Sequence, residues 1–171
     1  YSMIILVLAM DISEIFLENV NWEKITQIGR GLSVLFDFGS VILVFFIGKK
    51  LFNNKIALLA TAFSGSAVLQ IQQSHYYTVD TFATFFSMLA VYFAILIYKY
   101  EWKNKVERVV NRKKISIPQF DLLLLSVGFG VLVGLAAASK INTVFVAVLL
   151  PISYLLLWNR YPQEDPIHKI E

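Results

Sequence analysis

The sequence predicts an all-α integral membrane protein with about five transmembrane helices and an amphipathic juxtamembrane region at its N-terminus. Of the 171 residues, 57% are hydrophobic and only 16% are charged, whereas soluble domains carry roughly 45–50% apolar and about 25% charged residues. Runs such as LLLLSVGFGVLVGLAAAS approach the length of about 20 apolar residues that a helix needs to cross a bilayer. No run alternates like a barrel strand, and backbone groups in hydrocarbon must be satisfied within their own element. Helices are therefore predicted for the membrane-embedded part.

Five segments are apolar enough to form the transmembrane bundle, which we place at residues 31–158. The predicted spans are 31–48, 56–73, 81–98, 122–139 and 143–158, of which the last is slightly short.

The N-terminal residues 1–30 are predicted to form an extracytoplasmic juxtamembrane segment. YSMIILVLAM is about half a span, and the stretch after it places Ile12, Ile15 and Phe16 among acidic residues at near-helical spacing. This pattern favours a helix that lies in the membrane interface. The alternative is the tail of a truncated transmembrane helix followed by a polar loop.

The distribution of basic residues predicts the orientation, because Lys and Arg tend to stay on the cytoplasmic side. If the helices alternate, residues 49–55, 99–121 and the tail 159–171 share one side and hold 12 of the 15 Lys and Arg residues. We therefore expect these segments to be cytoplasmic and residues 72–80 to be extracytoplasmic, in a bacterial or archaeal plasma membrane or in the endoplasmic reticulum. The bilayer is the expected surrounding, and the charge pattern does not favour nucleic acid as a partner.

A polar cluster, QQSHYYTVDTF, lies between two apolar segments, and it provides most of the candidate site residues. Two interpretations stay open: Thr78 or Asp80 caps the next helix while the tyrosines belong to an interfacial aromatic belt, or the cluster lines an aqueous cavity. His75 and Asp80 are too few to specify a metal site, which takes three or four ligands, and the chain has no cysteine. The candidate residues for binding or catalysis are Gln73, His75, Tyr76, Tyr77 and Asp80.

A second candidate is Lys140, which lies in a short turn between two apolar segments on the predicted extracytoplasmic side. It is either an interfacial lysine whose amine reaches water or a cation for a lipid phosphate, with Asn142 and Thr143 as neighbouring donors.

Asp37 interrupts the first predicted span, where a carboxylate is costly unless it meets a polar or aqueous partner. We expect a polar group of a neighbouring helix to meet it. Asp37 and Asp80 would also suit a small transporter, but the chain has no broken-helix or repeat signal to support that function.

The order of these features resembles the polyprenyl-phosphate-dependent glycosyltransferases of the GT-C superfamily, which include protein O-mannosyltransferases and lipid A aminoarabinose transferases. The resemblance rests on three stretches in order, and it covers almost the whole chain: GRGLSVLFDFGSVILVFFIGKKLF, NNKIALLATAFSGSAVLQIQQSHYYTVDTFATFF and GVLVGLAAASKINTVFVAVLLP. It implies transfer of a sugar from a polyprenyl-phosphate-linked donor to an acceptor on the extracytoplasmic face. YYTVDTFATFF matches the family's second lumenal loop, so Asp80 becomes a catalytic candidate. AAASKIN resembles its small-residue run that ends in Ser/Thr-Lys, which makes Lys140 the candidate for the donor phosphate.

The resemblance also implies what is missing. The family's principal catalytic carboxylate lies in a loop that precedes the position of Tyr1, so we expect a 171-residue fragment to be inactive alone. The sequence indicates no certain cofactor, and a divalent metal is left open for the full-length enzyme. The alternative is a non-catalytic membrane subunit that packs with other subunits in a larger complex.

The predicted orientation can be tested by cysteine labelling, since the chain has no native cysteine. A membrane-impermeant thiol reagent added to intact cells should modify a cysteine at position 74 and not one at position 105. The opposite pattern would overturn the topology.

Overall fold

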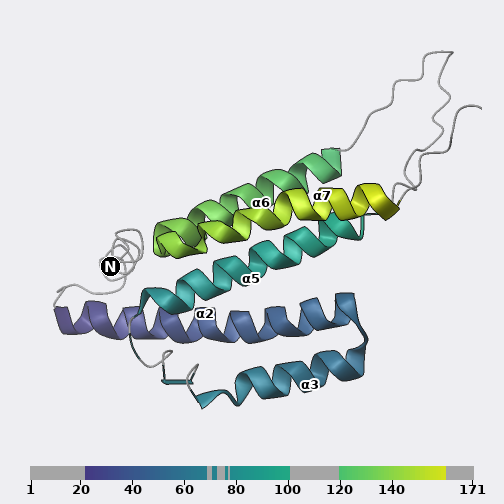
Figure 1. Cartoon of the computed structure of the whole chain (residues 1–171). Coiled ribbons are helices and arrows are strands. Elements are labelled where there is room, and N and C mark those ends of the chain that lie inside the picture. Colours follow the sequence, from purple (N-terminus) through teal and green to yellow (C-terminus); the bar gives the residue numbers. More distant parts are fainter. Residues whose placement is uncertain (1–21, 69–70, 73–75, 77, 101–119, 161–171) are drawn as a thin grey trace, which may run out of the picture.

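A computed structural model of the chain describes residues 22–68, 71–72, 76, 78–100 and 120–160 (Figure 1). Helices and their connections make up this part, and none of the described residues lies in a strand. The elements are α2 (Trp22–Leu51), α3 (Asn54–Gly65), α5 (Val79–Tyr98), α6 (Phe120–Ser139), the 3₁₀ helix η2 (Ile141–Val148) and α7 (Leu149–Arg160). The all-α membrane fold is thereby confirmed. The predicted interfacial helix before residue 22, the loop 101–119 and most of the tail 159–171 lie outside the described residues.

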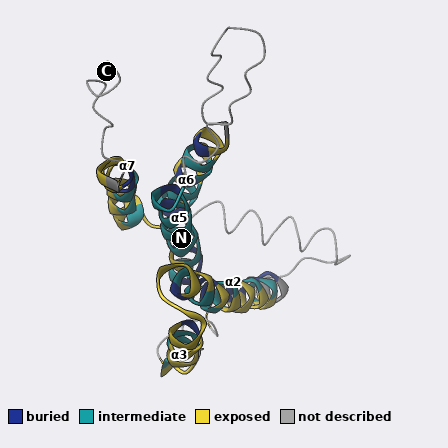
Figure 2. Cartoon of the chain, turned by 90° about the vertical axis from the view of Figure 1, so that its right-hand side faces the viewer, coloured by how far each residue is buried: buried dark blue, intermediate teal, exposed yellow. Residues whose placement is uncertain are grey.

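Four helical segments are long and apolar enough to cross a membrane in the described part of the chain. They are Ile25–Leu51, Val79–Tyr98, Asp121–Ser139 and Ile141–Asn159. Figures 1 and 2 show that α5 lies between α2 on one side and α6 with α7 on the other, while α3 packs on the far side of α2. Each of the other spans packs against α5, which therefore holds them together.

The predicted span 56–73 differs in the structure, because α3 has only 12 residues. Such a helix is about 18 Å long, well short of the roughly 30 Å hydrocarbon core. Its N-terminus is capped by Asn53, whose side chain accepts a hydrogen bond from the amide of Ile56 at 2.9 Å. It ends at Gly65, where the Ser66 hydroxyl donates to the carbonyl of Ala62 at 2.7 Å. The small polar run Ser64 to Ser66 thus interrupts the segment, since serine side chains compete for helix carbonyls.

The last span changes helix type in its middle. Residues 141–148 form a 3₁₀ helix, and the α-helix begins at Leu149, two residues before Pro151. Proline has no amide hydrogen and crowds the carbonyl four residues earlier, but it is tolerated in the first turn of an α-helix. The chain therefore starts a new helix just before Pro151. A hydrogen bond of 2.6 Å between the hydroxyls of Ser126 and Tyr154 joins α7 to α6.

Aromatic rings fix the register between α2 and α5, which run in the same direction. Phe36 contacts Phe82 and Phe85 with ring centroids 4.8 and 4.9 Å apart. Farther along, Phe46 lies 6.3 Å from Tyr92. Both the first and the last contact join residues that differ by 46 positions, so this offset gives the level of any α2 residue on α5.

The antiparallel register between α5 and α6 depends on a glycine. A Cβ at Gly128 would lie 2.6 Å from the ring of Phe93, so only glycine lets this ring lie against the backbone of α6. The ring belongs to a core around Ala90, Ala94 and Phe129, whose exposed fractions are at most 5%. Small residues on both sides allow this close helix approach.

A pair of substitutions in α6 tests this contact. Gly128→Val should reduce the free energy of unfolding by about 1–3 kcal/mol, because the added methyls displace Phe93. Gly130→Val is the matched control, since nothing lies within 4 Å of a Cβ there and both changes alter helix propensity equally. Thermal or denaturant unfolding in detergent measures the difference. Equal stability of the two variants would contradict the packing role of Gly128.

Candidate functional site

The two strongest candidates from the sequence, Asp80 and Lys140, form an ion pair although 60 positions separate them. The Lys140 Nζ atom lies 2.7 Å from Asp80 Oδ1. Both side chains are partly open to solvent, with 47% of Lys140 and 36% of Asp80 exposed. The structure therefore joins the polar cluster before α5 to the turn after α6.

The register of α5 against α6 brings these charges together. Asp80 lies 13 residues before Phe93, and Lys140 lies 12 residues after Gly128, the residue that Phe93 contacts. At a rise of 1.5 Å per residue these separations are about 20 and 18 Å along antiparallel helices. Both side chains consequently reach the same end of the bundle.

Asp80 belongs to the first turn of α5, where a carboxylate is favoured by the helix dipole. The N-cap position is occupied by Thr78 in an extended conformation, but its side chain makes no capping hydrogen bond. Thr81 donates from its hydroxyl to the Thr78 carbonyl at 3.1 Å instead. The Asp80 carboxylate is thus directed to Lys140 while it still benefits from the helix N-terminus.

The backbone of Lys140 is held on both sides of the turn. Its amide donates to the carbonyl of Ala136 at 2.8 Å, which completes the last turn of α6. Its carbonyl accepts from the amide of Thr143 at 3.0 Å and from the Thr143 hydroxyl at 2.7 Å. Asn142 lies exposed in the first turn of η2, two residues after Lys140. Thr143 therefore fixes the turn and the amine of Lys140 stays accessible.

Of the remaining candidates in the polar cluster, Gln73, His75, Tyr76 and Tyr77, the structure describes only Tyr76. It is 63% exposed, and its carbonyl accepts a hydrogen bond from the Thr78 amide at 2.8 Å. Gln73, His75 and Tyr77 lie outside the described residues. Asp37 is half-buried in the middle of α2. Among the described residues, no group of three His, Cys, Asp or Glu side chains could hold a metal ion.

An extension of α2 beyond the start of α5 was not predicted. The offset of 46 places Val34 level with Asp80, so the 12 residues from Trp22 onward continue for about 18 Å past that level. Figure 1 shows α2 reaching beyond the start of α5. Its polar side chains line a cavity of about 340 Å³: Glu23, Thr26, Gln27 and Arg30. The predicted span began at residue 31 because these four polar residues interrupt the apolar run. Their spacing is nevertheless typical of one helix face.

The buried hydroxyl of Ser33, near the ion pair, was also missed. Ser33 is fully buried, and its offset partner on α5 is Val79, next to Asp80. Neither the Ser33 hydroxyl nor the Thr78 hydroxyl has a hydrogen-bond partner among the described residues. A serine in a small-residue stretch, GLS, gives no sequence signal that separates such a group from one that permits helix packing.

The family model of dolichyl-phosphate-mannose-protein mannosyltransferases matches residues 19–167, a range that contains every described helix. No curated protein sequence and no solved structure matches the chain significantly. The matched range contains both members of the Asp80 and Lys140 pair. The chain therefore belongs to the dolichyl-phosphate-mannose-protein mannosyltransferase family, whose members are membrane mannosyltransferases that use dolichyl-phosphate-linked sugar donors.

Proposed function

We propose that this chain takes part in moving a sugar from a polyprenyl-phosphate donor to an acceptor on the extracytoplasmic face, as a glycosyltransferase of the GT-C architecture. The observation that carries the proposal is the Asp80 and Lys140 ion pair at one end of the bundle in a member of this family. A donor of this kind brings an anionic phosphate to the membrane boundary and a sugar beside it. The pair offers one cation and one carboxylate at a single location.

The role proposed for Lys140 is to bind the donor phosphate. An ammonium group pairs with phosphate oxygens as a point charge, and almost half of this side chain is open to an incoming group. A partly exposed ion pair contributes only about 0–1 kcal/mol, so a phosphate that reaches Lys140 has to replace only a weak internal contact. A phosphate can therefore compete with Asp80 for Lys140.

The role proposed for Asp80 follows from that competition. When the phosphate occupies Lys140, the carboxylate loses its partner and becomes an acceptor for a hydroxyl of the sugar or the acceptor. A carboxylate within hydrogen-bond reach of a hydroxyl can orient it or accept its proton. Asn142 and Tyr76, both exposed near the two ends of the pair, are proposed as further donor contacts.

The alternative is a non-catalytic subunit in which the same ion pair only ties the start of α5 to the turn after α6. In that case the pair would contribute stability and no ligand would need either charge. Donor binding and transfer therefore have to be measured separately from folding.

Donor affinity tests the role of Lys140. Lys140→Gln should weaken binding of a dolichyl-phosphate-linked sugar in nanodiscs roughly tenfold to a hundredfold, because a charge-assisted hydrogen bond is lost. Lys140→Arg should retain part of the affinity, since it keeps the charge. Lys50→Gln at the opposite end of the bundle is the control for net charge. If Lys140→Gln binds as tightly as the unaltered protein, Lys140 is only an interfacial anchor.

A charge exchange separates function from structure at Asp80. Asp80→Asn should abolish most sugar transfer by the complete enzyme while its unfolding temperature changes little, because an exposed pair contributes little stability. The double variant Asp80→Lys with Lys140→Asp can form the pair again, so it should fold normally and still fail to transfer sugar. Normal transfer by the exchanged protein would show that the pair has only a structural role and that Asp80 is not catalytic.

A further inference from the structure

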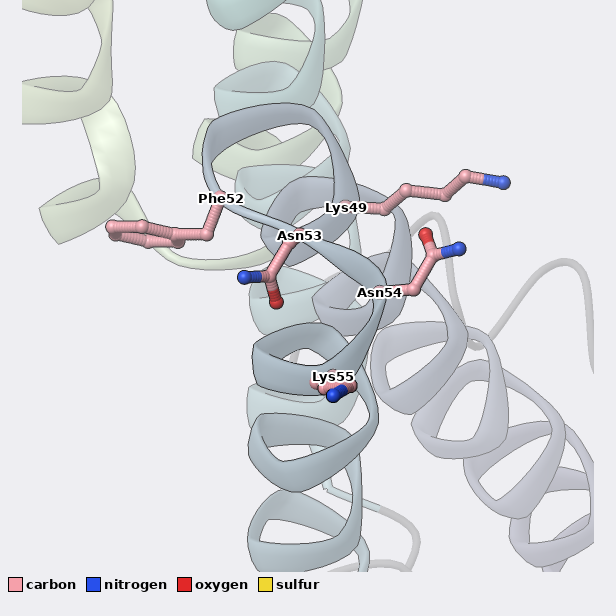
Figure 3. A pocket seen from close by; sticks show the side chains of 5 residues that line it. All are labelled: Lys49, Phe52, Asn53, Asn54 and Lys55. Atoms are coloured by element: carbon pink, nitrogen blue, oxygen red, sulfur yellow. The ribbon is translucent and has the colours of Figure 1, made fainter.

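The opposite end of the bundle contains a basic pocket at the turn between α2 and α3. The pocket has a volume of about 590 Å³ and is lined by Lys49, Phe52, Asn53, Asn54 and Lys55. Figure 3 shows Lys49 and Asn54 extending to one side of the turn, Phe52 to the opposite side, and Lys55 in the first turn of α3. None of the five lining residues is acidic, so the pocket presents two positive charges and two amides.

The pocket lies at the level where the apolar spans end. Lys49 and Lys50 are in the last turn of α2, and the Lys99 amine, just after α5, donates to the carbonyl of Lys50. This bond ties the end of α5 to the end of α2. The offset of 46 between these helices gives the same level independently, because it aligns Lys99 with Asn53. The pocket is therefore at a membrane boundary, where lipid headgroups lie.

Apolar side chains continue from the pocket along α3. Leu59 and Phe63 follow Lys55 at intervals of four residues, which places the three on one face of the helix. Leu59 is 59% exposed and Phe63 is 71% exposed. One helix face thus has a charge at its end and an uncovered hydrocarbon surface next to it.

The amides are free to act as donors. Asn53 uses its carbonyl oxygen to accept the hydrogen bond from Ile56, and Figure 3 shows its NH₂ group on the side of Phe52, whereas the Asn54 amide lies on the side of Lys49. Lys49, Asn54 and Lys55 are exposed. Two ammonium groups and the Asn54 amide provide hydrogen bonds that a phosphate oxygen accepts.

We propose that this pocket binds an anionic phospholipid, with the headgroup phosphate between Lys49 and Lys55 and an acyl chain along Leu59 and Phe63 of α3. The lipid is a structural ligand that is separate from the sugar donor, because the pocket lies at the end of the bundle opposite to Asp80 and Lys140. It covers the apolar face of α3, whose 12 residues are too few to span the bilayer.

Lipid titration followed by native mass spectrometry tests this site. The delipidated protein in detergent should bind phosphatidylglycerol in preference to phosphatidylcholine, and the single changes Lys49→Gln and Lys55→Gln should each weaken phosphatidylglycerol binding by at least tenfold. Lys50→Gln is the matched control, because Lys50 neighbours the pocket without lining it. It should weaken binding less than twofold.

Two results would overturn the proposal. If Lys50→Gln weakens binding as much as Lys49→Gln, the attraction is diffuse and the pocket has no role. If glycerol phosphate displaces bound phosphatidylglycerol at the same concentration as a competing phospholipid, only the headgroup contributes to binding. Leu59→Ser leaves the lysines in place and should weaken phosphatidylglycerol binding. Glycerol phosphate should still fail to displace the lipid from this variant. Unchanged unfolding temperatures of all variants show that exposed positions were altered without loss of the fold.

Discussion

The contact between Phe93 and the backbone at Gly128 sets the geometry on which the candidate site depends. Because α5 and α6 run antiparallel, this one contact in the middle of the bundle determines which residues meet at its ends. A slip by one helical turn would move Lys140 by about 5 Å along α6 and break its 2.7 Å contact with Asp80. The register is held by rigid packing of an aromatic ring against a glycine, so two partly exposed charges can meet reliably although their own attraction is weak.

The two ends of the bundle differ in how their charges are used. At one end, Asp80 and Lys140 neutralise each other in an ion pair that is partly exposed to solvent. At the other end, the lysines around the α2 and α3 turn have amide and backbone neighbours, and Lys99 is occupied by a carbonyl. A ligand at the first end must replace an internal partner, whereas a ligand at the second end adds one. Binding at the first end therefore changes the state of a protein carboxylate, which a purely structural lipid contact does not.

The sequence predicts the helices and their number well because hydrocarbon leaves the backbone few alternatives. The hydrophobic pattern could not predict that α3 would end within the segment 56–73. Ser64, Gly65 and Ser66 are each compatible with a membrane helix. The helix ends where the Ser66 hydroxyl donates a hydrogen bond to the Ala62 carbonyl. The start of α2 was also placed nine residues late, since polar residues that extend a helix beyond the membrane look like a loop to a hydropathy count. Asp80 and Lys140 were singled out individually, but their pairing required the α5 and α6 register, which no local pattern contains.

The extension of α2 gives the ion pair a polar neighbourhood on one side. From the level of Asp80, α2 continues for three further turns that carry Arg30, Gln27, Thr26 and Glu23 around a cavity. Ser33, buried beside the start of α5, leaves a hydroxyl without a partner among the described residues. A buried hydroxyl costs free energy unless something bonds to it, and Thr26, Gln27 and Arg30 lie within the candidate span Ile25–Leu51. These polar groups lie at the same end of the bundle as the ion pair, so a ligand bound to Lys140, as proposed, would meet a polar helix end there and not a purely hydrocarbon surface.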